Sequence, residues 1–405
     1  MVALSIMAAM QIAVPESASG SAALPRDLVV IGRRASNSER VLAACIERSC
    51  PPDQEIEATL LHAEDLFLAG EYQRARSVLL KGRRRNNRFG ERFPLALADL
   101  NRANARLASL NGLTDSARIG TVDTLTILRR GFGKQDTRVL VQRLEVGDLF
   151  ARQGRERAAT DVYAAVEKQA RDTGLRWIEG LAMFRTAALY GAIASVQPSY
   201  RSSARRAAAR ISATSDADME PFRQGVLLMQ AKLAALDGKD GDMERIIAAL
   251  KATPATQPML VDAPPIDYPP LGIRDLARAN KLHGGDVRPC WIDVGFWVAQ
   301  NGTVRQPSVL RRSCHAEDDW IEPVLTAVRG RRYAPLAIPA DHPGVARIER
   351  FSLIHDRQRE KGSRVPSRTA VGRIERVDLT GGSAPTLQPV RSVVPPDEIA
   401  QPAEH

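Results

Sequence analysis

The sequence repeats one helix–turn–helix pattern, and the spacing of its turn glycines limits the fold more than any other feature. Gly70, Gly112 and Gly154 are 42 residues apart, and an alanine follows each of them five residues later. Gly238 lies 84 residues, or two periods, after Gly154. The position one period after Gly154 is Val196, which is not a glycine but falls between two helical stretches. Apolar residues at helical intervals flank the turns. Five units with one period predict an all-α array of helical hairpins.

A hairpin of this kind cannot bury its apolar face alone, so the units over residues 53–252 are expected to stack into a solenoid. The pattern resembles the tetratricopeptide repeat, in which Gly70, Tyr72 and Ala75 would be the turn glycine, the aromatic packing residue and the small helix-crossing residue. Solenoids of this kind commonly bind peptides or protein segments. An inert helical spacer is the alternative.

The chain is basic, with a formal net charge of +10 and a sequence pI near 9.8. Its densest basic segments are Arg83 to Arg85 with Arg88, and the run from Arg201 to Arg210. Both lie on or near expected helices, and no aromatic residues are interleaved for stacking on bases. We interpret them as solvated helix faces and expect no nucleic-acid partner. Peripheral association with an acidic membrane surface or a cell-wall polymer stays open.

Residues 1–24 have the composition of a signal peptide. The apolar run MVALSIMAAMQIAV is too short to span a bilayer and is followed by small residues. Because no positively charged start precedes it, a buried helix is the alternative. A cleaved signal would place the protein in the periplasm. Residues 25–52 would then form an N-terminal strand, Asp27 to Arg34, and a turn containing cysteines.

Four cysteines form an even set, which suits an oxidising compartment and permits three pairings. Their spacing favours two local disulfides, Cys45 with Cys50 and Cys290 with Cys314. The second pair flanks two strand-like segments joined at Asn301-Gly302, which is a strong hairpin signal. A one-residue change of loop geometry would bring these two cysteines face to face. The alternative is a zinc site made of Cys290, Cys314, His283 and His315, at a spacing that matches no familiar finger.

The composition changes after the helical part. Residues 253–282 are rich in proline and predict a linker. Residues 283–356 show the order strand, strand, helix, strand, which predicts a small α+β domain with one helix packed on an antiparallel sheet. Residues 357–405 are polar and contain glycine and proline, so we expect a disordered tail.

The order of these elements resembles the C-terminal domain of TonB-type proteins. In that family a Tyr-Pro precedes an alternating strand, a glycine turn leads into a second strand, and a helix ending in Ala-Val-Arg leads to an aromatic-x-Pro motif. The matching part of this chain runs from about Pro264 to His355. The motif residues here are Tyr268, Pro269, Phe296, Gly302, Ala327-Val328-Arg329, Tyr333 and Pro335.

The resemblance implies a domain that binds an extended peptide by strand addition to an exposed sheet edge. By position, the edge strand would be Arg347 to Ile354. In the family this edge receives a short motif of outer-membrane transporters. We therefore predict a periplasmic adaptor or scaffold that binds such transporters or other envelope proteins. The residues of the partner-binding edge would be Arg347, Glu349, Phe351 and Leu353.

Two other functions stay open. A TonB-type energy transducer would need a membrane anchor and a long proline-rich arm, where this chain has a signal, helical hairpins and a short linker. A cell-wall binder or an enzyme is the second alternative. As a further hypothesis, the transporter-like segment Asp27 to Arg34 adds as a strand to the C-terminal domain of its own or a neighbouring chain. The other interpretation is that it packs on the first helices.

No motif in the sequence indicates catalysis, so we expect a protein without catalytic, cofactor-binding or metal-binding residues. A nucleophile elbow G-x-S-x-G, the zinc motif H-E-x-x-H and a dinucleotide or phosphate loop are all missing. Residues Gly131 to Lys134 lack the first glycine and the hydroxyl residue of a phosphate loop. Asp318-Asp319 lies where a helix is expected to begin, and carboxylates stabilise a helix N-terminus without any catalytic role.

Overall fold

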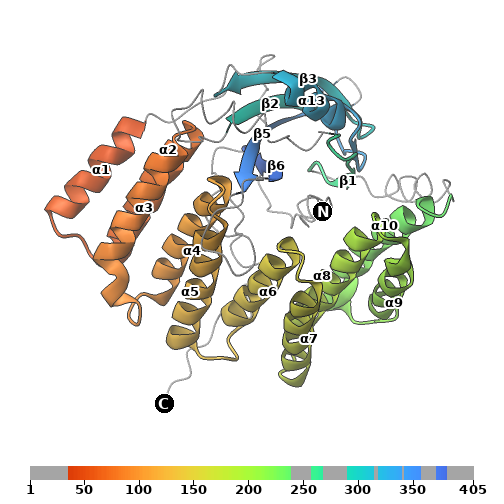
Figure 1. The fold of residues 1–405 in the computed structure, drawn as a ribbon, viewed down its shortest axis with the longest axis horizontal. Coiled ribbons are helices and arrows are strands. Elements are labelled where there is room, and N and C mark those ends of the chain that lie inside the picture. Colours follow the sequence, from red (N-terminus) through yellow and green to blue (C-terminus); the bar gives the residue numbers. More distant parts are fainter. Residues whose placement is uncertain are drawn as a thin grey trace. The chain divides into compact units, whose positions relative to one another are not determined.

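The computed structural model describes residues 35–238, 257–267, 290–313, 318–339, 342–356 and 371–380. Helices come first along the chain and an antiparallel sheet follows (Figure 1). The described residues divide into two compact units. One combines residues 35–127 with the C-terminal strands, and the other comprises residues 128–238. The expected signal peptide and the segment Asp27 to Arg34 lie outside the described residues.

The helical part agrees with the predicted hairpins. Pro52 and Pro94 each stand in the first turn of a helix, where a missing N–H costs nothing. The Asp136 side chain caps another helix by accepting a hydrogen bond of 2.9 Å from the Arg138 amide. The described helices are α1 (Ala35–Glu47), α2 (Pro52–Leu68), α3 (Tyr72–Asn86), η2 (Asn87–Phe89), α4 (Pro94–Leu110), α5 (Thr114–Phe132), α6 (Thr137–Arg152), α7 (Glu156–Asp172), α8 (Arg176–Ala194), η3 (Pro198–Tyr200), α9 (Arg201–Ser212), η4 (Ala217–Met219) and α10 (Glu220–Ala235).

The repeat glycines end helices in the same way. Gly70, Gly112 and Gly154 all have positive φ, at 83°, 69° and 69°. In each turn the amide after the glycine donates to the carbonyl five residues earlier, and the glycine amide donates to the carbonyl three residues earlier. This is the Schellman arrangement, which favours glycine because only glycine adopts positive φ without strain. The predicted turns between α2 and α3, α4 and α5, and α6 and α7 are therefore confirmed.

The unit of residues 128–238 is held together by buried charges as well as apolar side chains. The Tyr163 hydroxyl donates to Asp148 Oδ1 at 2.6 Å, and Arg185 pairs with the same carboxylate. Tyr163 lies against Gly147, where a Cβ would overlap its ring. Burial raises the pKa of Asp148, although Arg185 opposes that shift. These contacts fasten α6, α7 and α8 to one another.

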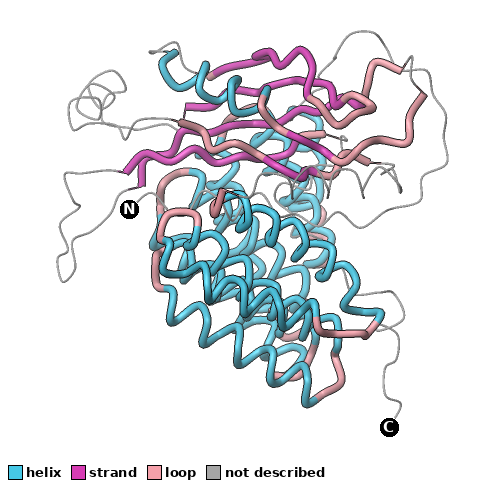
Figure 2. Tube along the Cα trace, turned by 90° about the vertical axis from the view of Figure 1, so that its right-hand side faces the viewer, coloured by secondary structure: helices cyan, strands magenta, loops and turns pink. Residues whose placement is uncertain are grey.

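The sheet has the strand order β3-β2-β5-β6, and every neighbouring pair is antiparallel. Its strands are among the magenta segments of Figure 2. It contains the strand–strand–helix–strand order that the sequence predicts. Its elements are β2 (Cys290–Val298), β3 (Val304–Arg312), η5 (Asp318–Trp320), α13 (Ile321–Arg329), β5 (Val345–Asp356) and β6 (Val371–Asp378). A separate two-stranded pair joins β1 (Leu260–Asp262) to β4 (Arg332–Tyr333).

Two predicted boundaries are wrong. The strand β6 lies in residues 357–405, which were expected to be a disordered tail, and β1 lies in the expected linker. The segment that forms β6, VGRIERVD, has the alternation of a strand, but the sequence around it contains glycine and proline and so predicts disorder. Pairing with β5 and contacts with helix α4 supply the stabilisation that local composition does not predict.

The sheet is covered on both faces. Ile292, Phe296 and Phe351 point to one face, where they form a buried cluster with Val324 and Val328 of α13. On the other face, Trp291, Ile354 and Val377 share a second buried cluster with α2, α3 and α4. Successive strand residues point to opposite faces, so β2 and β5 serve both layers. The helical hairpins, the sheet and α13 thus form three successive layers within one unit.

Candidate functional site

A buried ion pair occupies the middle of the sheet. Asp293 of β2 lies directly opposite Arg350 of β5 in the strand register, and both side chains are fully buried. Arg350 Nε donates to Asp293 Oδ1 at 2.6 Å, and Arg350 NH2 donates to Asp293 Oδ2 at 3.0 Å. The half-exposed Arg311 of β3 donates to the same carboxylate at 2.9 Å. A carboxylate with this many donors is held in one place.

The remaining donors of Arg350 leave the sheet and reach helix α2. Arg350 NH1 donates to the carbonyl of Phe67 at 2.6 Å, and NH2 donates to that of Leu68 at 2.9 Å. These carbonyls belong to the last turn of the helix, where the helix dipole is negative; that of Phe67 already accepts from the Gly70 amide and takes the Arg350 donor as a second one. Arg350 therefore caps the end of α2 from the sheet.

An aromatic cluster surrounds this guanidinium. The Trp291 ring centroid lies 3.9 Å from the Arg350 Cζ, and the rings of Phe67 and Tyr72 stack on each other at 5.0 Å. Trp291 also packs on Gly70, where a Cβ would overlap the indole. Gly70 thus has two functions: it adopts positive φ, and it makes room for the sheet.

Burial opposes the charge on Arg350, but the hydrogen bonds to Asp293 and the charge of its carboxylate outweigh burial and raise the pKa of Arg350. Burial is also the main cause of the raised pKa of Tyr72. The Tyr72 hydroxyl lies 3.0 Å from Ser352 Oγ. Arg350 is therefore charged, and Tyr72 neutral, at any physiological pH.

A second arginine repeats this capping one hairpin further on. Arg373 NH2 of β6 donates to the carbonyl of Ser109 at 2.9 Å, in the last turn of α4. Ser109 stands three residues before Gly112, as Phe67 stands three residues before Gly70. Two neighbouring strands thus fasten the sheet to equivalent positions of two successive hairpins.

The predicted partner-binding edge is wrong, because β5 is not an edge strand. It pairs with β2 on one side and with β6 on the other. Phe351 and Leu353 are buried, Arg347 pairs with Asp378 of β6 at 2.5 Å, and Glu349 binds the buried Arg331 at 2.7 Å. The resemblance extends only to His355 and so cannot reveal that a later strand of the same chain covers this edge.

Four residues of the predicted TonB-like motif, Phe296, Gly302, Tyr333 and Pro335, come together at one end of the sheet. The Tyr333 amide donates to the carbonyl of Gly302 at 2.8 Å, and a Cβ on Gly302 would overlap the Tyr333 carbonyl. The rings of Phe296 and Tyr333 lie 6.4 Å apart, and Pro335 follows two residues later. Tyr268 and Pro269 lie outside the described residues. The motif therefore builds the hairpin end of the sheet.

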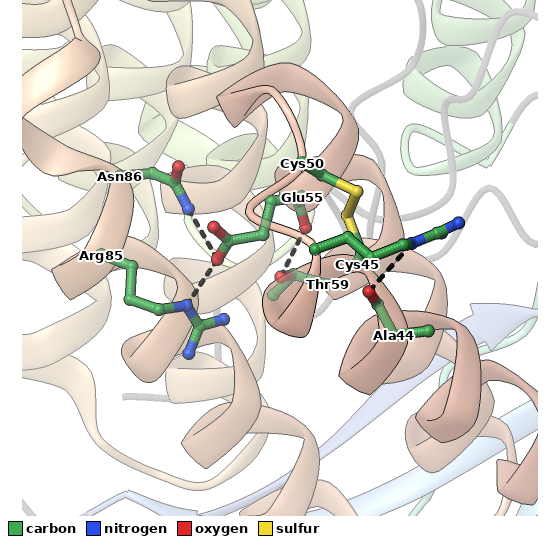
Figure 3. Close-up of a disulfide and its surroundings, with 8 residues drawn as sticks. Ala44, Cys45, Cys50, Glu55, Thr59, Arg85 and Asn86 are labelled. Atoms are coloured by element: carbon green, nitrogen blue, oxygen red, sulfur yellow. Dashed lines mark hydrogen bonds and ion pairs between the residues drawn. A yellow bond between two sulfur atoms is a disulfide. The ribbon is translucent and has the colours of Figure 1, made fainter.

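The Cys45–Cys50 disulfide is confirmed. It joins the last turns of α1 to the segment just before α2, close to the ion pair of Glu55 with Arg85 (Figure 3). Cys290 begins β2, whereas Cys314, His283 and His315 lie outside the described residues, so the second pairing stays a prediction.

Sequence reasoning missed the contact between the sheet and the helical hairpins. The available signal was a charged residue inside each of two strands: Asp293 stands between Ile292 and Val294, and Arg350 precedes Phe351. Buried charges need partners, so such residues indicate a polar contact within the core. Their partners on α2, however, are backbone carbonyls, which no side-chain pattern in the sequence reveals.

Within the described residues, no group of three or more His, Cys, Asp or Glu side chains is placed to hold a metal ion. An open hollow lies between β3 and α13, lined by Val309, Leu310, Arg311, Arg312, Ile321 and Glu322. None of the described helices combines the length and apolar character needed to cross a bilayer. The described residues define a class: a helical-hairpin protein with an antiparallel sheet docked on its first hairpins. No family model, curated protein or solved structure matches the chain.

Proposed function

We propose that this chain is a protein-binding adaptor of the periplasm, and that its sheet accepts an extended segment of a partner by strand addition. The observation that supports this most directly is the outer edge of β6. Its register with β5 runs without a shift from Asp356↔Val371 to Glu349↔Asp378, and β6 pairs with no other described strand. A regular edge offers a continuous row of backbone donors and acceptors to an incoming strand.

The opposite edge of the sheet is protected against the same event. In β3, Gln306 has a positive φ of 50° and the next residue is Pro307, which has no N–H. Two register shifts interrupt its pairing with β2. Bulges, prolines and charges are the features by which natural edge strands avoid pairing. The contrast favours β6 as the binding edge.

The transducer function has less support than the adaptor function. The strand that would receive the transporter motif by resemblance, β5, is already paired on both sides, so a partner would first have to displace β6. The helical hairpins offer the adaptor a second surface for partners, since arrays of this kind commonly bind protein segments.

The test uses the full chain and a displayed library of extended peptides. We expect selected peptides to slow amide hydrogen exchange in Val371–Asp378, because new hydrogen bonds form along β6. Matched peptides with N-methyl groups on alternate backbone amides should lose binding, since methylation removes the donors. The proposal would be contradicted if binding survived methylation of the odd-numbered amides and also methylation of the even-numbered amides. Protection from hydrogen exchange that is confined to β3 or the helices would contradict it as well.

A further inference from the structure

Basic side chains gather at the C-terminal end of α3 and in the segment that follows it. The inward-facing arginines are neutralised: Arg85 Nε binds Glu55 at 2.5 Å, and Arg83 lies 3.6 Å from Asp123. The outward-facing cations are exposed and form no ion pair with any described residue. These cations are Lys81, Arg84, Arg88 and Arg92.

This distribution separates the cluster from the other basic run of the sequence. In α9, Arg201 and Arg205 both pair with Asp237, and Arg210 pairs with Glu167 at 2.5 Å. Three of the four arginines of that run are therefore paired with a carboxylate, and Arg206 alone among them forms no ion pair with a described residue. Helix-dipole stabilisation accounts for Arg84 in the last turn of α3. It does not extend to Arg88 or Arg92, which lie beyond the helix.

Apolar groups lie among these cations. The Arg88 guanidinium lies 4.7 Å from the Phe89 ring centroid, and that of Arg92 lies 5.2 Å from the Phe93 ring centroid. Leu95, at the start of α4, is 45 % exposed. One carboxylate, that of Glu91, is exposed in the same segment. The segment therefore presents cations, stacked rings and an exposed leucine together.

We propose that this surface, defined as Lys81, Arg84, Arg88, Phe89, Arg92, Phe93 and Leu95, docks on an anionic lipid bilayer. Cations attract lipid phosphates, and apolar side chains enter the boundary between headgroups and acyl chains. A soluble polyanion would use the cations but would gain nothing from Leu95. The inference goes beyond the proposed adaptor function and depends on different residues.

The position of the surface suits attachment to a membrane. The sheet contacts the first turn of α3, where Tyr72 meets Ser352, whereas Arg84 lies twelve residues further along the same helix. At 1.5 Å per residue this separation is about 18 Å. Lipid bound at the far end of α3 would therefore leave the sheet unobstructed.

The test is sedimentation of the full chain with vesicles of phosphatidylcholine alone or of equal parts phosphatidylcholine and phosphatidylglycerol. We expect binding to the anionic vesicles only, weakening as salt rises. The triple variant R84Q/R88Q/R92Q should bind on the order of 100-fold more weakly. Leu95→Ser should weaken binding about tenfold, because the leucine no longer enters the bilayer.

The matched control is R201Q/R205Q/R210Q, which removes the same charge from arginines that are paired with carboxylates. It should bind vesicles like the wild type, and the circular dichroism spectra of all variants should agree. Equal loss in both triple variants would show that binding follows net charge, and would overturn the proposal. So would unchanged binding of Leu95→Ser combined with equally tight binding of soluble polyphosphate, which would indicate a polyanion site.

Discussion

Arg350 and Arg373 stand on neighbouring strands and donate to equivalent carbonyls, those of Phe67 and Ser109, at the ends of helices α2 and α4. The repeat of the helical hairpins is thus matched by a pair of arginines on the sheet. Because the carbonyls at each helix end can accept a further hydrogen bond besides that of the turn glycine amide, a sheet that carries two suitably placed guanidinium groups can dock without complementary side chains on the helices.

Removing the first of these caps should destabilise the protein strongly. In Arg350→Met, Asp293 loses its buried ion pair and the carbonyls of Phe67 and Leu68 each lose a charged donor, so the free energy of unfolding should fall by about 3 kcal/mol. Urea unfolding of the full chain measures the change. Arg305→Met on the exposed part of β3 is the control and should cost less than about 0.5 kcal/mol. Equal effects of the two substitutions would show that the buried contacts contribute little.

Gly70→Ala and Gly154→Ala separate backbone strain from close packing. Both glycines have positive φ, so each alanine should cost about 1–2 kcal/mol of strain. Only at Gly70 would the new Cβ overlap Trp291, whereas nothing lies within 4 Å of a Cβ on Gly154. Gly70→Ala should therefore lower the melting temperature more, and Trp291→Ala in the same chain should cancel the excess. An equal shift for the two glycines would contradict the packing contact.

Truncating the chain before or after β6 should show that β6, and not the residues that follow it, stabilises the sheet. A stop codon at position 357 removes β6 and leaves the regular strand β5 unpaired on one side, which should lower stability and promote self-association. A stop codon at position 381 retains β6 and Thr380 and serves as the control. Sedimentation velocity and thermal unfolding of both chains provide the measurement. A monomeric first truncation with unchanged stability would be incompatible with the role assigned to β6.

The buried His62 should make stability dependent on pH. Its Nδ1 lies 3.1 Å from Ser38 Oγ, and burial lowers its pKa below the ordinary value of 6.5, although the Glu39 charge opposes this shift. A lowered pKa in the folded state means that the unfolded chain binds the proton more readily. Stability should thus be complete above pH 6.5 and fall as the pH drops towards the folded pKa. His62→Gln should show a flatter profile of unfolding free energy over this range.

The Cys45–Cys50 disulfide should stabilise chiefly the first helix pair. It closes a short loop, so its removal should cost about 2 kcal/mol in the chain-entropy description. In the Cys45→Ser, Cys50→Ser double variant we expect faster amide exchange in α1 and little change in α6 to α8. If amide exchange became equally faster in both units, the disulfide and α1 would stabilise the whole chain and not only the neighbouring helix.

The predictable part of this fold is the part encoded by local pattern. Turn glycines must adopt positive φ, so Gly70, Gly112 and Gly154 identify the hairpins directly from the sequence. Asn301-Gly302 identifies the β2–β3 hairpin for the same reason. In contrast, β6 depends on pairing with β5, and a stretch of sequence that contains glycine, proline and serine separates the two strands. The alternation of apolar and polar residues in β6 was not enough to predict a strand there.

The candidate site was less predictable than the fold. The sequence placed Glu349, Phe351 and Leu353 in a strand, and the structure agrees, but which side of that strand is open depends on the whole sheet. The capping contact of Arg350 with Phe67 joins a side chain to a backbone carbonyl. Any residue can supply that carbonyl, so no spacing or residue type in the helical part predicts this contact.

The capping of α2 by Arg350 has a consequence for synthesis. Phe67 and Arg350 are 283 residues apart in the chain, so the first hairpin leaves the ribosome long before its cap exists. Until β5 is made, the Phe67 and Leu68 carbonyls lack the hydrogen bonds from Arg350, and until β2 is made the surface of Gly70 lacks the Trp291 ring. Contacts of such long range form late and slowly. The first hairpins therefore complete their folding last, although they are translated first.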